Sequence, residues 1–175
     1  MHESQRRIAF EILYAENAAP VYRFALRLCG NKEDAEDMAA EALVQAYRKW
    51  SGYKGHASPR TWLCAIVLNQ WRMRQRRGMV HEVSLDSIQE VAASFEFVDY
   101  ELAEAIYALS DRLREAFLLV KGEGFTHAEA AKTLRVPVGT VYFRVHSAVH
   151  QLRKTLGSPA RVQMPVAEGK VSDEM

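Results

Sequence analysis

Four stretches of the chain combine residue types that suit binding rather than covalent chemistry. Residues 31–41 hold five acidic side chains and one basic side chain, and residues 60–77 hold five arginines and no acid. Residues 82–104 hold seven acids and no base, whereas residues 112–155 hold eight bases and three acids. The net charge of +1 is therefore a cancellation of alternating blocks. Such asymmetry is typical of a nucleic-acid binder that has a separate protein-facing surface.

A helix-turn-helix near the C-terminus is the most specific motif. The sequence predicts a short helix capped by Thr126, a tight turn over 135–137 and a long helix over 138–156. The long helix has an apolar face that we expect to pack inward, formed by Val138, Val141, Val145, Ala148 and Leu152. The outer face and its flank would enter the major groove of duplex DNA, and they comprise Thr140, Tyr142, Phe143, Arg144, His146 and Ser147. An ordinary helical hairpin is the alternative, and the basic charge of the block favours DNA.

A second candidate site lies in the helix predicted from Pro59 to Arg77, which begins apolar and ends basic. Its last two turns contain four arginines that could neutralise phosphates, and Trp62 and Trp71 could stack on unpaired bases. The alternative is that both tryptophans are core residues. Asn69 favours a functional role, because an amide within an apolar stretch needs a partner.

These candidates lie on segments with helical periodicity, and alternating strand patterns are nearly absent. Apolar residues recur at helical spacing over 21–28, Gly30 ends that helix, and Asn31 is a predicted cap of the next. The next helix has a long apolar stripe over 35–50 opposite an acidic side. Ser58 is the predicted N-cap of the basic helix, with Pro59 in its first turn.

We therefore expect an all-α fold with two small helical domains. The first covers residues 1–78 and the second covers residues 98–157, with an acidic linker over 79–97 and a disordered tail over 158–175. No apolar run is long enough to span a membrane, and the first residues lack the apolar core of a signal peptide. These features predict a soluble, cytoplasmic protein.

Catalysis is the weakest interpretation of the sequence. The six histidines are scattered, and neither a G-x-G-x-x-G string nor a P-loop occurs. His146 and His150 have the i,i+4 spacing of a metal pair, but the glutamate of an H-E-x-x-H motif is missing. The two cysteines, Cys29 and Cys64, form neither a disulfide framework nor a zinc pair. We expect no enzymatic activity, no cofactor and no metal.

Two blocks resemble the extracytoplasmic-function sigma factors. The first is DAEDMAAEALVQAYRKW followed by SPRTWLCAIVLNQWRMRQRR, and the second is LSDRLREAFLLVKGEGFTHAEAAKTLRVPVGTVYFRVHSAVHQLRKTL. The resemblance covers residues 14–157 and implies an initiation factor with only the second and fourth sigma regions. Such a factor binds RNA polymerase core, recognises a duplex upstream and a single-stranded downstream promoter element, and opens the downstream one. A helix-turn-helix regulator that does not bind core is the alternative, and it does not explain the separate acidic helix.

Carried over by position, the resemblance implies roles for named residues. Those expected to bind polymerase are Asp34, Asp37, Glu41 and Arg48. Those expected to bind promoter DNA in the first domain are Arg60, Trp62, Asn69, Arg72, Arg74, Arg76 and Arg77, beside a loop over 53–59 that would cradle an extruded base. Those in the second domain are Thr126, Thr140, Tyr142, Phe143, Arg144, His146 and Ser147. The resemblance leaves open whether an anti-sigma factor is a further partner.

The chain also departs from the family pattern. Ala40 stands where glutamine is usual, Leu68 where a basic residue is frequent, and Met73 where aspartate is common. Only Arg144 remains of the basic set in the recognition helix, so the family's usual upstream sequence does not carry over. Arg135 replaces a turn glycine, which costs about 1–2 kcal/mol if that residue is left-handed.

Overall fold

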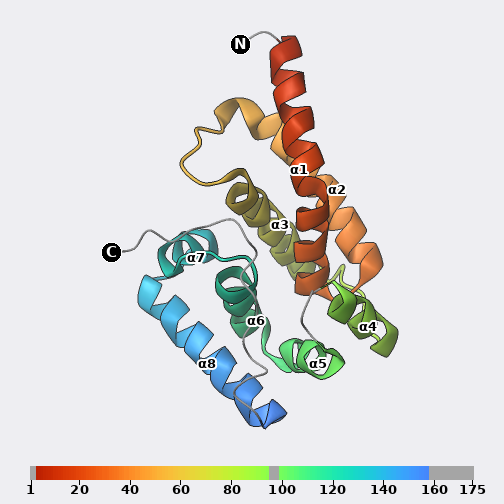
Figure 1. The fold of residues 1–175 in the computed structure, drawn as a ribbon, viewed down its shortest axis with the longest axis vertical. Coiled ribbons are helices and arrows are strands. Elements are labelled where there is room, and N and C mark those ends of the chain that lie inside the picture. The colour runs from red at the N-terminus through yellow and green to blue at the C-terminus, as the bar shows by residue number, and fades with distance from the viewer. Residues whose placement is uncertain (1–2, 95–98, 158–175) are drawn as a thin grey trace. The chain divides into compact units, whose positions relative to one another are not determined.

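The computed structural model describes residues 3–94 and 99–157, and all regular elements in these ranges are helical (Figure 1). The chain divides into two compact units, residues 1–94 and 95–175. This arrangement confirms the predicted all-α class. The predicted disordered tail and residues 95–97 of the predicted linker lie outside the described residues. None of the described helices is both long and apolar enough to cross a membrane.

The core of the first unit lies between α1 (Glu3–Cys29), α2 (Lys32–Lys49) and α3 (Pro59–Arg76) (Figure 1). The predicted apolar face of α1 is fully buried, including Val21, Phe24 and Leu28. Gly30 ends α1 with a positive φ of 72°, a conformation that glycine adopts without strain.

Helix α2 begins as the sequence predicts, because the Asn31 side chain accepts a hydrogen bond from the Asp34 backbone N–H at 3.1 Å. Its apolar stripe is buried from Ala35 to Ala46. The stripe ends earlier than expected, since Tyr47 is 38% exposed and Trp50 is half-buried in a 3-10 turn, η1 (Trp50–Gly52).

Helix α3 begins at the predicted cap, where the Ser58 hydroxyl accepts a hydrogen bond from the Thr61 backbone N–H at 3.1 Å. Pro59 follows as the first helical residue, where its missing N–H costs nothing. Most of the helix is buried, and Trp71 is 3% exposed, so this tryptophan is a core residue.

The first unit runs beyond residue 78, where the first domain was expected to end. Residues 85–93 of the acidic segment form α4 (Leu85–Ala93), which buries Ile88 and Val91. The Arg27 guanidinium on α1 donates a hydrogen bond of 2.6 Å to the carbonyl oxygen of Ser94. A short amphipathic helix with two apolar anchors therefore packs within the first unit.

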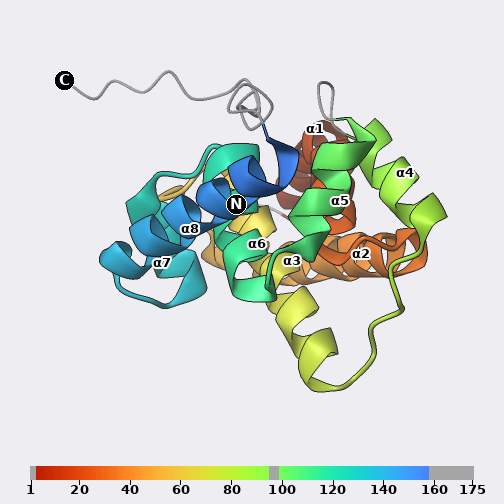
Figure 2. The same ribbon diagram turned by 90° about the horizontal axis from the view of Figure 1, so that it is seen from below.

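The second unit contains α5 (Tyr100–Ala108), α6 (Asp111–Phe117), a π-helical turn η2 (Leu118–Gly122), α7 (His127–Leu134) and α8 (Val138–Leu156) (Figure 2). The π turn continues directly from the end of α6. Buried Arg114 secures the corner between α5 and α6, because its guanidinium donates to the Leu109 carbonyl and pairs with Asp111 at 2.6 Å.

The helix-turn-helix has the predicted form. Thr126 and Glu129 make a reciprocal capping box at the start of α7. Arg135 has φ 56° and ψ 46°, so a non-glycine residue occupies the left-handed position of the turn. The inward face of α8 is buried at Val141, Val145, Ala148 and Leu152. Val138 is the exception at 45% exposed, because it opens the helix at the turn and lies outside the packed part of that face.

Candidate functional site

Helix α2 presents an acidic face, which consists of Glu33, Glu36, Asp37 and Glu41. All four residues are exposed, and the Asp37 side chain retains 63% of its accessible surface. On the opposite side Ala35, Met38 and Ala42 are fully buried. Ala40 and Arg48 are also exposed. The face is thus a charged, solvent-exposed surface, on which Asp37 contacts Arg74 and Glu33 lies near His81.

Asp34, for which the resemblance implies a role in polymerase binding, does not belong to this exposed surface. Its side chain is 1% exposed, and both carboxylate oxygens are occupied. Oδ2 accepts a hydrogen bond of 2.9 Å from the His81 backbone N–H, and Oδ1 lies 3.0 Å from His81 Nδ1. Asp34 is therefore a structural acceptor within the first unit.

Arg74 is likewise engaged inside the protein rather than open to phosphate. Its Nη1 lies 3.4 Å from Asp34 Oδ1 and its Nη2 lies 3.6 Å from Asp37 Oδ2. The Arg74 side chain is 14% exposed. Two carboxylates of α2 already hold the guanidinium, so its position does not favour the expected contact with DNA phosphates.

Aromatic side chains gather where α2, the following loop and α3 meet. Tyr53 stacks on Trp50 with ring centroids 5.3 Å apart, and it lies 4.8 Å from the Trp62 ring. The Tyr53 hydroxyl donates a hydrogen bond to the Ala57 carbonyl, and burial raises the pKa of Tyr53. The loop that was expected to cradle a base is thereby tied to a ring platform at the start of α3.

One face of α3 remains accessible although most of the helix is buried. It follows the helical spacing of three and four and consists of Trp62, Ala65, Asn69, Arg72 and Arg76. Asn69 is exposed, while its neighbours Leu68 and Gln70 are 0% and 2% exposed. The Asn69 amide therefore points outward and needs no partner within the core. An aromatic ring, an amide and two arginines follow one another along a single face.

The start of α8 presents an exposed aromatic pair. Phe143 is 69% exposed, and Tyr142 is 57% exposed. Tyr142 is held by α7, because its ring stacks on His127 with centroids 3.8 Å apart and planes 6° apart. Thr126 at the start of α7 is exposed, and its hydroxyl accepts a hydrogen bond from the Glu129 backbone N–H.

Comparison with known proteins assigns this arrangement to a family. Residues 13–79 match the family of sigma-70 region 2, and residues 100–152 match sigma-70, region 4. The ECF RNA polymerase sigma factor SigM of Mycobacterium tuberculosis is 30% identical over 159 residues, which cover 89% of this chain and 81% of SigM. The chain belongs to the ECF RNA polymerase sigma factors. The sequence prediction of this family is confirmed.

Other relatives of this sigma factor support the same family assignment. SigE of Mycolicibacterium smegmatis is 32% identical over 162 residues, which cover 85% of this chain and 62% of SigE, so the match spans less than two thirds of that relative. The sigma factor RpoE of Bartonella quintana, solved in complex with the anti-sigma factor NepR, is 25% identical with a TM-score of 0.64. That match covers 80% of this chain and 92% of RpoE. CnrH, solved with the cytosolic domain of CnrY, shares the fold with a TM-score of 0.67 at 23% identity, over 86% of this chain and 89% of CnrH.

The remaining residues that were expected to bind promoter DNA differ in their exposure to solvent. Arg77 and His146 are exposed, whereas Arg60, Thr140, Arg144 and Ser147 are half-buried. Within the first unit the structure brings Trp62, Asn69, Arg72 and Arg76 onto one face and separates them from Arg74. In the described part of the chain, no group of three or more His, Cys, Asp or Glu side chains is placed to hold a metal ion.

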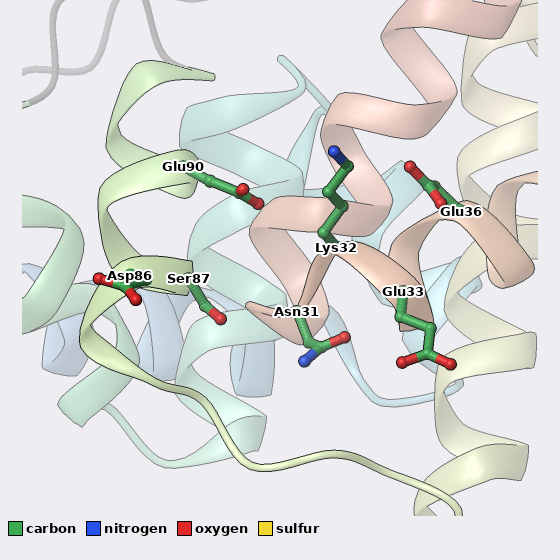
Figure 3. Close-up of a pocket in the computed structure, with 7 residues that line it drawn as sticks. All are labelled: Asn31, Lys32, Glu33, Glu36, Asp86, Ser87 and Glu90. Carbon is green, nitrogen blue, oxygen red and sulfur yellow. The ribbon is translucent and has the colours of Figure 1, made fainter.

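A pocket between the start of α2 and α4 extends the acidic character of the first unit (Figure 3). Its lining residues are Asn31, Lys32, Glu33, Glu36, Asp86, Ser87 and Glu90. Burial and the carboxylates of Glu36 and Glu90 raise the pKa of Tyr22. Two of the lining residues, Glu33 and Glu36, also belong to the acidic face of α2.

Sequence reasoning missed His81, which the structure places against α2. The residue lies in a segment without periodicity, and its partner Asp34 is 47 residues away. A hydrophobic pattern contains no signal for such a contact.

Proposed function

We propose that this sigma factor binds polymerase core through the acidic face of α2, captures the unpaired downstream element on the exposed face of α3, and uses α8 for the upstream element. It acts by binding rather than by catalysis, and it does so in the cytoplasm, where core polymerase is found.

Support for the docking role comes from the contrast between the two sides of α2. Asp37 and Glu41 are exposed, although the residue that follows each of them, Met38 and Ala42 respectively, is fully buried. Like charges one turn apart repel each other and do not stabilise a helix, so folding alone does not favour them. A basic surface on the partner would offset that repulsion. The proposal rests chiefly on the exposure of these acids opposite a fully buried side of the helix.

The proposal for the downstream element rests on the exposed face of α3. Bases stack on aromatic rings at about 1–3 kcal/mol each, and arginines in a neighbouring groove attract the backbone. Trp62 at one end of the face and Arg72 and Arg76 at the other provide these two elements, with the Asn69 amide between them. The loop after Trp50 is tied to Trp62 through Tyr53, which brings it next to the same rings.

The proposal for the upstream element rests on the outer surface of α8. Arg144 and exposed Phe143 lie one position apart near its start, where recognition helices contact base edges. A phenyl ring contacts a thymine methyl, and an arginine reaches guanine or phosphate. We propose that this aromatic pattern, rather than a set of arginines, gives the factor its promoter preference.

A protein inhibitor is a further partner that we propose, since the Bartonella relative was solved with an anti-sigma factor. Capture of the tagged factor from a lysate of its own organism, with and without added core polymerase, tests this. A protein that leaves the factor when core is added is expected.

Run-off transcription tests the whole assignment. The full chain is mixed with core polymerase and a promoter library, and the transcripts are sequenced. We expect discrete start sites that require both the factor and core. Binding to duplex DNA without any gain in transcription would instead favour a regulator that does not bind core.

A further inference from the structure

His81 contacts the carboxylate of Asp34 through both its backbone N–H and its imidazole ring. Its backbone N–H donates to Asp34 Oδ2 at 2.9 Å, while its ring Nδ1 lies 3.0 Å from Asp34 Oδ1. The two residues are 47 positions apart, and His81 belongs to the segment of residues 79–84 that joins α3 to α4. We call this pair of contacts the His81 clamp. It fixes the path of the chain where it leaves α3.

The carboxylate in the clamp also organises the acidic face. Asp34 is 1% exposed, and Arg74 reaches it from α3 at 3.4 Å. The second arm of the same guanidinium lies 3.6 Å from Asp37, the exposed acid one turn further along α2. Asp34 therefore connects residues 79–84, α3 and the acidic face through a single buried group.

The Arg74 guanidinium interacts with two acids at once, Asp34 and Asp37. When His81 satisfies Asp34, the guanidinium can bridge Asp34 and Asp37 and hold the exposed carboxylate in one orientation. Without His81, the buried carboxylate has Arg74 as its remaining charged partner, and an uncompensated buried charge is costly. Arg74 is then drawn toward Asp34 and away from Asp37.

We propose that His81 is a positioning residue for polymerase binding, which acts through Asp34 and Arg74 to hold Asp37 and the segment 79–84 in place beside the acidic face of α2. This inference rests on the proposed docking role of that face. His81 itself need not touch polymerase.

The clamp depends on the charge of the imidazole. The groups that face His81 are Asp34 and Glu33 on α2, the latter 4.0 Å from Nε2, and Arg74 on α3. The hydrogen bond to Asp34, followed by the attraction of Asp34 and Glu33, raises the pKa of His81, against smaller opposing effects of burial and Arg74. The neutral Nδ1–H tautomer still donates to Asp34 but carries no charge, whereas the protonated ring adds the attraction of both acids. The clamp is therefore strongest at acidic pH and weakens as the pH rises through the raised pKa.

The test measures the affinity of full-length protein for core polymerase between pH 6 and pH 8.5. Four proteins are compared: wild type, His81→Ala, His81→Asn and, as a matched loss of an exposed imidazole, His150→Ala. We expect His81→Ala to bind about two- to fivefold more weakly at pH 6, the range of a partly exposed ion pair. Its difference from wild type should shrink toward pH 8.5.

The asparagine variant separates positioning from general structure. Its side-chain amide occupies the place of Nδ1 and donates to Asp34 without titrating. We expect His81→Asn to recover part of the lost affinity and to lack the pH dependence that wild type and His150→Ala share. Because the His81 side chain is 57% exposed, its removal leaves no cavity, and circular dichroism should be unchanged.

Charge reversal at Asp37 and Glu41 is measured in parallel. If that variant loses core binding while His81→Ala keeps wild-type affinity at every pH, the clamp has no positioning role and the docking assignment stands. If charge reversal leaves binding unchanged, the docking assignment fails, and the positioning role fails with it. NMR titration of the His81 ring adds a direct readout, with a pKa above 6.5 in wild type and a decrease in Asp34→Asn. An unraised pKa in wild type would contradict the clamp itself.

Discussion

The imidazole of His127 and the phenol of Tyr142 lie parallel, with ring centroids 3.8 Å apart and planes 6° apart. The stack joins α7 to α8 and fixes Tyr142, whereas the next residue, Phe143, is 69% exposed. Two adjacent aromatic residues thus have different tasks: Tyr142 joins the two helices of the motif, and Phe143 extends outward.

Phe143→Ala is expected to change which upstream sequences are used. Loss of contact with a thymine methyl costs about 1–3 kcal/mol at the affected base pair. Selection on randomised upstream DNA, with transcription as the readout, should show the preference shifting at defined positions. If the same promoters are chosen by the variant, Phe143 belongs to a partner surface instead.

Tyr142→Ala is the matched comparison at the neighbouring position. We expect it to lower the free energy of unfolding of the second unit by about 0.5–1.5 kcal/mol, because the stack on His127 is lost. Transcription should fall evenly across promoters, without a change in preferred bases. A shift in base preference would mean that Tyr142 itself contacts the DNA.

Asn69→Ala should weaken promoter opening and spare both folding and core binding. Loss of one base contact costs about 1–3 kcal/mol, and an exposed side chain contributes little to stability. Open complexes are counted on a duplex promoter and a premelted one. Gln70→Ala is the control, since Gln70 is 2% exposed and its truncation should lower the melting temperature. If Asn69→Ala opens the promoters as well as wild type does, Asn69 is not part of the downstream site.

Asp34→Ala should destabilise the first unit, whereas Asp37→Ala should not. Removing the buried carboxylate leaves the His81 N–H and the Arg74 guanidinium without their acceptor, at a cost of about 1–3 kcal/mol. Asp37 is 63% exposed, and its loss should change stability by less than about 0.5 kcal/mol. Urea titration of both variants measures the difference, and equal stabilities would contradict the placement of Asp34.

These acids show where sequence reasoning reaches its limit. The stripe from Ala35 to Ala46 and the exposed acids opposite it follow from helical periodicity, and so do the inward valines of α8. The family resemblance implies the same polymerase-binding role for Asp34 and Asp37. Burial of the first depends on Arg74 and His81, which approach from 40 and 47 residues away. Contacts of that kind are set by tertiary packing, which local spacing does not encode.

The backbone conformation of Arg135, unlike the burial of Asp34, could be predicted from the sequence. The helix-turn-helix motif has a left-handed residue at a known position in its turn. With φ at 56°, Arg135→Gly is expected to stabilise the second unit by about 1 kcal/mol. Arg153→Gly in the last turn of α8 is the control, where glycine should destabilise by up to about 1 kcal/mol. Chemical denaturation followed on the second unit measures both changes. Destabilisation by Arg135→Gly would contradict the observed turn.

The central claim is that the acidic face of α2 binds polymerase core. The most direct test is the affinity of core for the full-length double variant Asp37→Lys and Glu41→Lys. A matched variant, Asp86→Lys and Glu90→Lys, makes the same change in net charge on α4 of the same unit. We predict that the α2 variant loses at least about tenfold in affinity, or 1.4 kcal/mol, while the α4 variant binds like wild type. Equal affinity of the α2 variant and wild type would contradict the account.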